Sequence, residues 1–136
     1  MMLLVDKKVD FKVLDNLYEI EDKWIKVFAG DIHLNESYLW HVFSKNYRQD
    51  YLEGDEAIEA FNNLKKKGYY IFYERYRYDD EDLSEYENKV FEVFGWSKLK
   101  AEDLFDCDIY VVDKEFKWTY VSTHEGDWFG PYFCKL

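Results

Sequence analysis

The sequence predicts an α+β fold: one domain over residues 1–136, with a mainly antiparallel or mixed sheet packed by about four helices. A length of 136 residues suits one core, which at this size buries roughly two-thirds of the unfolded chain's surface. Aromatic residues make up 21% of the chain, so rings build much of that core. Strand-like and helix-like runs do not alternate strictly, and three strand-like runs end the sequence, which favours α+β over a parallel α/β fold.

The first predicted elements are a strand and a helix. Residues 9–14 are short and partly alternating, which is typical of an edge strand. Asn16 provides an N-cap, and apolar residues then recur at helical spacing until Gly30. The stripe on this helix is expected to face the core.

Two further segments precede the first long strand. Residues 35–47 fit both a helical and a strand period, and we expect a helix into at least His41. Residues 53–55 break the chain and begin a clear helix. Lysines 65–67 are expected in its last turn, where cations complement the carbonyl end, and Gly68 is expected to stop it.

The middle of the chain is predicted to hold a strand and a helix. Residues 69–78 form a strand by composition, with its first half buried and its second half solvated. Residues 79–82 end that strand and lead into a helix that stops near Gly95, and residues 97–105 add one more helical turn. The apolar stripe of the helix is Leu83, Tyr86, Val90, Phe91 and Phe94.

The C-terminal thirty residues predict a β-hairpin followed by a closing strand. Residues 109–112 and 118–123 are the two hairpin strands, and the polar residues 113–116 reverse the chain in a turn longer than two residues. Glycines 126 and 130 then bracket a loop, and Pro131 leads into the closing run 132–136.

The sequence resembles a known family at four places: LWHVFS (39–44), EAIEAF (56–61), IYVVDKEFKWTYVSTHE (109–125) and GPYF (130–133). The family is a small bacterial one, the domain of unknown function 4275, found in Gram-positive spore-formers. This resemblance implies a single small cytoplasmic domain. It implies no activity and supplies no catalytic residue.

The formal charge of −11 is concentrated in one stretch. Between Asp79 and Asp108, eleven acidic residues stand against three lysines, a net of eight negative charges. Such a field repels phosphate, which argues against nucleic-acid binding, and it attracts a basic protein partner. A solvated helix face is the competing interpretation. The candidate binding residues in this stretch are Asp79, Asp80, Glu81 and Asp82.

The compartment follows from the apolar runs and the cysteines. No apolar run is long enough to span a membrane, and MMLLV is too short for the apolar part of a signal peptide, so we expect a cytoplasmic protein. Cys107 and Cys134 are then two reduced thiols, with a disulfide as the alternative if their strands are neighbours.

His41, His124 and Asp127 are the weak candidates for catalysis, because imidazole titrates near neutral pH and a carboxylate can orient it. Glu125 adjoins His124 but would point to the opposite face of a strand, so Asp127 is the better third residue. The competing interpretation is structural: His124 closes a strand and His41 is a half-buried partner for a tyrosine. No metal site and no cofactor are predicted, since phosphate loops, dinucleotide fingerprints and paired-cysteine zinc patterns are all missing from the sequence.

Residues 124–129 are the junction where a site is most expected. Trp128 and Phe129 follow a glycine and, if exposed, are typical interface anchors, and Glu125 adds an acidic contact. The competing interpretation is that both rings fold back over the sheet. We therefore expect a non-enzymatic accessory, inhibitor or immunity-type protein, monomeric or weakly dimeric. The alternative is a small metal-dependent or His-based hydrolase using His41 and His124.

Overall fold

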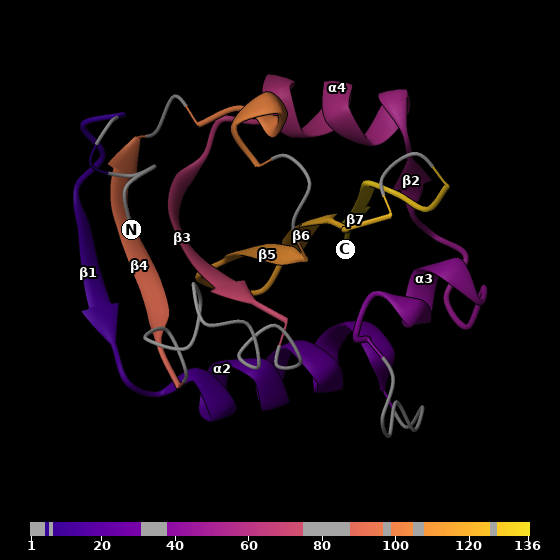
Figure 1. Cartoon of the computed structure of the whole chain (residues 1–136), viewed down its shortest axis with the longest axis horizontal. Coiled ribbons are helices and arrows are strands. Elements are labelled where there is room, and N and C mark those ends of the chain that lie inside the picture. Colours follow the sequence, from indigo (N-terminus) through magenta and orange to yellow (C-terminus); the bar gives the residue numbers. More distant parts are fainter. Residues whose placement is uncertain are drawn as a thin grey trace.

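The computed structural model describes Val5 and residues 7–30, 38–74, 88–96, 99–104, 108–125 and 128–136. The strands are β1 (Phe11–Leu14), β2 (Leu52–Glu53), β3 (Lys67–Tyr73), β4 (Val90–Trp96), β5 (Ile109–Asp113), β6 (Trp118–Ser122) and β7 (Tyr132–Lys135). They form one seven-stranded antiparallel sheet in the order β1-β4-β3-β5-β6-β7-β2 (Figure 1). The prediction of an α+β fold with a mainly antiparallel sheet is confirmed.

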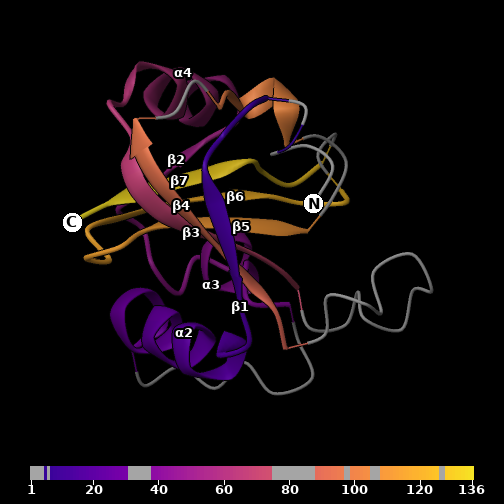
Figure 2. The same ribbon diagram turned by 90° about the vertical axis from the view of Figure 1, so that its left-hand side faces the viewer.

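Helices lie on both faces of this sheet. The α-helices are α2 (Leu17–Trp24), which continues into a π-helical turn (Ile25–Ala29), α3 (His41–Ser44) and α4 (Asp55–Asn63). Figures 1 and 2 show α2 and α3 on one face and α4 on the other. The described part of the chain therefore has three α-helices rather than about four, and a 3-10 turn at Ala101–Asp103 supplies the helical turn expected within residues 97–105.

Each strand of the C-terminal hairpin buries both of its sides. Tyr110 and Val112 belong to a core cluster with the α2 and α3 residues, whereas Ile109 and Val111 belong to a second cluster with α4. This division follows from the two-residue period of a strand. The predicted hairpin, its long turn and the closing strand β7 are confirmed.

Helix α2 forms where the sequence predicted a helix, and its apolar stripe packs on the sheet. Leu17 and Trp24 are fully buried, and the Trp24 indole N–H donates to the hydroxyl of Thr119 on β6. Asn16 occupies the N-cap position but makes no capping hydrogen bond with its side chain. Gly30 follows the π-helical turn with a φ of 64°, which agrees with the expected stop.

Helix α4 begins at the predicted break, because Gly54 takes a φ of 68° just before Asp55. Its end differs from the prediction. The helix stops at Asn63, so lysines 65–67 lie beyond the last turn, and Gly68 lies within β3, where a register shift occurs. Lys66 nevertheless binds the carbonyl end of the helix, with Nζ 2.7 Å from the Phe61 oxygen.

The helix predicted to run from residue 83 to Gly95 is wrong at its C-terminal end, where Val90–Trp96 is strand β4. Val90, Phe91 and Phe94 fit a helical stripe, but Phe91 and Val93 also share one side of a strand. Pairing with β1 and β3 buries Val90, Phe91 and Val93 almost completely, and this burial decides between the two periods. Residues 75–87 lie outside the described residues.

The predicted strand from Tyr69 corresponds to β3, which lies in the middle of the sheet. Its two faces divide as expected, with Tyr70 and Phe72 in one cluster and Tyr69 and Ile71 in the other. Glu74, the first residue of the half expected to be solvated, is instead fully buried.

None of the described helices is long and apolar enough to cross a membrane.

Candidate functional site

Asp108 is a fully buried carboxylate just before β5, at the end of the hairpin where β6 also ends. Its Oδ1 accepts the indole N–H of Trp40 at 3.1 Å and the backbone N–H of His124 at 3.0 Å. A buried carboxylate is costly unless several donors compensate it. The donors around Asp108 therefore fix the junction after β6 to the start of β5.

The same carboxylate holds the ring of His124. Nδ1 lies 2.7 Å from Oδ2 and 2.9 Å from Oδ1 of Asp108, so a neutral ring carries its proton on Nδ1 and leaves the Nε2 lone pair free. The His124 side chain is 31% exposed, and Nε2 lies 3.9 Å from Oε1 of Glu125. An imidazole oriented in this way can accept a proton or bind a cation through Nε2.

A second buried carboxylate, Glu74, lies next to this pair, because the backbone N–H of Glu74 donates to the carbonyl of Asp108. Oε2 of Glu74 accepts the Tyr110 hydroxyl and the backbone N–H of Leu39, while Oε1 has no hydrogen-bond partner among the described residues. Burial raises the pKa of Glu74 to about 7, against the lowering effect of those two hydrogen bonds, with a smaller rise from the carboxylates of Glu21 and Asp108.

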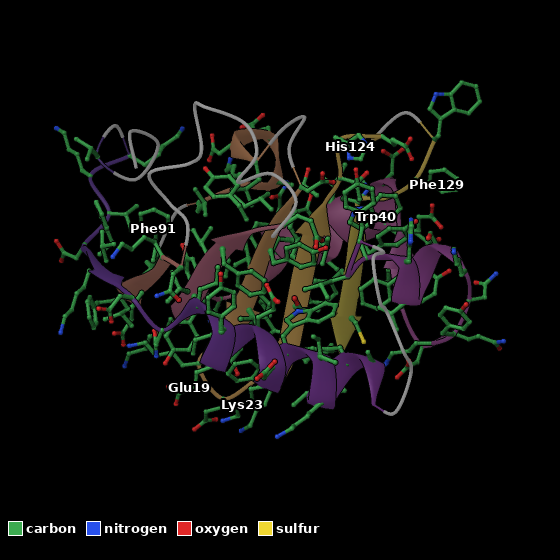
Figure 3. The ribbon with its side chains drawn as sticks, turned by 60° about the horizontal axis from the view of Figure 1, so that its bottom comes forward. Glu19, Lys23, Trp40, Phe91, His124 and Phe129 are labelled. Atoms are coloured by element: carbon green, nitrogen blue, oxygen red, sulfur yellow. The ribbon has the colours of Figure 1, made fainter. Side chains whose placement is uncertain are left out.

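Aromatic rings cover the two carboxylates. Tyr38 and Trp40 stack at 5.4 Å between ring centres, and each also contacts both histidines. Trp40 anchors this cover, because its backbone N–H donates to the Tyr110 hydroxyl. Figure 3 shows Trp40, His124 and Phe129 gathered at one end of the molecule, far from Phe91.

His41 contacts the rings of both Tyr38 and Trp40. It contacts Tyr38 edge-on at 5.6 Å, which agrees with the structural interpretation of His41 as a half-buried partner of a tyrosine. Its pKa is lowered, first by burial and then by the nearby charge of Lys45. Both histidines thus contact the rings of Tyr38 and Trp40, but they do not hydrogen-bond to each other.

Two large rings after His124 are exposed to solvent, and they differ in how far. Trp128 is 83% exposed, whereas Phe129 is 41% exposed and contacts Trp40 at 5.9 Å. The backbone N–H groups of both residues donate to the carbonyl of Glu125, and the Thr123 hydroxyl donates to the carbonyl of Phe129. The interpretation that both rings fold back over the sheet is therefore wrong for Trp128.

The sequence singles out residues 124–129 but neither of the two buried acids, Asp108 and Glu74, that lie beside them. The sequence places Asp108 in the acidic stretch and predicts Glu74 at a solvated strand end, whereas both are fully buried. Pairing Ile109 with Ser122 in the predicted hairpin puts Asp108 beside the residues that follow β6, so the hairpin register was the available signal. Asp127, and the acidic residues Asp79, Asp80, Glu81 and Asp82, lie outside the described residues, as does Cys107.

The described residues gather no group of three or more side chains that could hold a metal ion. A groove of about 600 Å³ lies elsewhere, at the edge of the sheet near β2 and α4, and none of the predicted site residues lines it. The polar junction and the groove are thus two separate features.

Residues 6–133 match the family described as Domain of unknown function (DUF4275), and the chain belongs to that family. The match covers all of the described sheet except the last two residues of β7. No curated protein and no solved structure matches the chain.

Proposed function

We propose that this chain is a non-enzymatic binding domain of a bacterial cytoplasm, of the accessory or inhibitor type, and that its partner is a basic protein. The observation that carries the proposal is the 83% exposure of Trp128 on a turn held by hydrogen bonds. The backbone N–H of Trp128 is already hydrogen-bonded to the carbonyl of Glu125, which lowers the conformational freedom that this residue loses on binding, and tryptophan is enriched among the residues that dominate interface energies.

Charge around Trp128 supports a basic partner. Glu125 has a side chain that is 45% exposed, and Oε2 of Glu53 accepts the backbone N–H of Gly130 two residues after Trp128. Asp127 precedes Trp128 in the sequence, and the whole chain carries a formal charge of −11. Acidic groups around an apolar side chain complement a partner protein whose apolar pocket is bordered by lysine or arginine. Such charge complementarity speeds association at low salt.

The test is a capture experiment with matched variants. A photoreactive phenylalanine analogue at position 128 should crosslink one basic protein from native lysate, and capture by the unmodified chain should weaken as salt rises. Trp128→Ala should lower the affinity for the purified partner by about 30-fold or more, as expected for a central aromatic anchor. Tyr18→Ala is the matched control, because Tyr18 is 52% exposed on α2, and it should bind like wild type.

Equal capture by the Trp128→Ala variant, or capture that does not respond to salt, would contradict the proposal. Glu125→Lys tests the charge separately from the ring. It should reduce the association rate more than the dissociation rate, whereas Glu59→Lys on α4 should change neither beyond the effect of net charge.

A second candidate function is a hydrolase that uses His124, and the Asp108–His124 pair favours it. In such an enzyme Nε2 would take a proton from water while the water oxygen attacks an ester carbonyl, and the imidazolium would then protonate the leaving alkoxide. His41 lies against the same rings and would act as a second titrating group. Hydrolysis of p-nitrophenyl esters should then fall at least 100-fold in His124→Gln, and a wild-type rate equal to that of buffer would overturn this candidate.

A further inference from the structure

Helix α4 lies beside the edge of the sheet formed by β7 and β2 (Figure 1). Residues of these three elements line a groove of about 600 Å³. Ala60, Asn63 and Leu64 line it from the helix side, and Phe133 lines it from the sheet side. Residues 49–52 close it along the edge. This volume falls within the range of roughly 300–1,000 Å³ that is common for small-molecule sites.

The side chains that line the groove separate into an apolar part and a polar part. Leu52, Leu64 and Phe133 supply apolar surface, and Gln49 and Asn63 supply amide groups. An apolar wall with a few polar groups is the usual composition of a site for a small amphipathic molecule.

The charged residues that line the groove indicate which charge its ligand carries. Asp50 is compensated by Arg48, whose Nε and Nη2 lie 2.6 and 2.9 Å from the two carboxylate oxygens. Lys135 also lines the groove, and no carboxylate among the described residues forms an ion pair with it. The uncompensated charge is therefore positive, although the whole chain is strongly acidic.

We propose that this groove binds a small monocarboxylate with an unbranched apolar body. The carboxylate pairs with Lys135 and accepts hydrogen bonds from the Asn63 or Gln49 amide, and the body lies against Leu52, Leu64 and Phe133. This groove is separate from the surface proposed to bind a protein partner, because neither Trp128 nor Glu125 lines it. The proposal concerns binding alone and includes no chemical step.

Three ligands with the same ten-carbon body test the assignment: decanoate, decanol and decylamine, each below its aggregation concentration. Calorimetry should show decanoate binding at least tenfold more tightly than decanol, and decylamine binding least. Lys135→Gln should reduce decanoate affinity to that of decanol. Lys12→Gln is the matched control, because Lys12 is an exposed lysine on β1 at the opposite edge of the sheet, and it should leave affinity unchanged.

Equal affinity for decanoate and decanol would overturn the role of Lys135, and the absence of binding by any of the three ligands below millimolar concentration would overturn the site itself. Amide chemical shifts measured during the titration should change at residues 49–52 and 133–135, and changes confined to other residues would also contradict it. Trp128→Ala should bind decanoate normally, so failure of this proposal and failure of the protein-partner proposal are distinguishable.

Discussion

Nδ1 of His124 lies 2.7 Å from Oδ2 of Asp108, and the same carboxylate also accepts the backbone N–H of His124. One buried acid thereby fixes both the ring and the backbone of a partly exposed histidine. The backbone hydrogen bond ties the histidine to the start of β5 without using the ring, so the ring hydrogen bond is not the only link that holds this junction.

The ring proton of neutral His124 is predicted to reside on Nδ1. Long-range nitrogen–proton NMR spectra should show that tautomer in the wild type, because Asp108 can only accept when ionised. In Asp108→Asn the amide can donate to Nδ1, so the proton should move to Nε2. The spectrum of His41 should be unchanged, and an Nε2–H tautomer in the wild type would contradict the assignment.

Glu74 is predicted to make the protein less stable as pH rises from 4.5 to 7. The pKa of Glu74 in the folded protein, about 7, exceeds the ordinary value of 4.5. The stabilisation by the protonated carboxyl is therefore fully present below pH 4.5 and is lost as pH rises through 7. The loss amounts to about 3 kcal/mol of unfolding free energy. Urea titrations between pH 4.5 and 8 should show this slope in the wild type relative to Glu74→Gln, and parallel profiles would contradict it.

Gly130 is predicted to tolerate a side chain less well than Gly54. Both have positive φ, at 84° and 68°, but an added Cβ at Gly130 would meet Tyr132 at 3.2 Å and Thr123 at 3.3 Å, whereas Gly54 has open space. Gly54→Ala should cost about 1 kcal/mol of unfolding free energy and Gly130→Ala roughly twice that. Equal losses in urea titrations would show that the neighbours of Gly130 move aside freely.

The thiol of Cys134 is predicted to be unreactive. The side chain is fully buried on β7, and burial raises its pKa to about 11, with Sγ 3.5 Å from the carbonyl oxygen of Asp50. In a Cys107→Ser background, Ellman's reagent at pH 8 should label Cys134 only as fast as the protein unfolds, and denaturant should release it. Rapid labelling of the native variant would contradict this placement.

The fold was largely predictable wherever pattern and turn signals agreed. Strand β5 is a short apolar run and β6 is rich in aromatic and β-branched residues, and a polar reversal separates them. Gly54 likewise precedes an amphipathic helix, so local chemistry determines the hairpin and α4. Val90–Trp96 could not be predicted in the same way, because its apolar residues satisfy a helical and a strand period together. Only pairing with β1 and β3, which are distant in sequence, decides the outcome.

The site was predictable only in part, for the same reason. His124 and Trp128 were identified because their residue types are unusual beside a strand end. Glu74 and Asp108 were not, since an acidic residue in a sequence carries no mark of burial. Their burial follows from the antiparallel pairing of β3 with β5, which brings the two strand ends together beneath Trp40.

The order of strands has a consequence for the protein during its synthesis. Both edge strands come from the N-terminal half, and each pairs with a strand that is synthesised later. Phe11 pairs with Val93, and Leu52 pairs with Phe133. The ribosome must deliver most of the chain before the sheet can close, so the nascent chain carries unpaired edge strands for most of its translation time. Such distant pairings slow folding, and the two edge strands stay open to aggregation until their partner strands have been made.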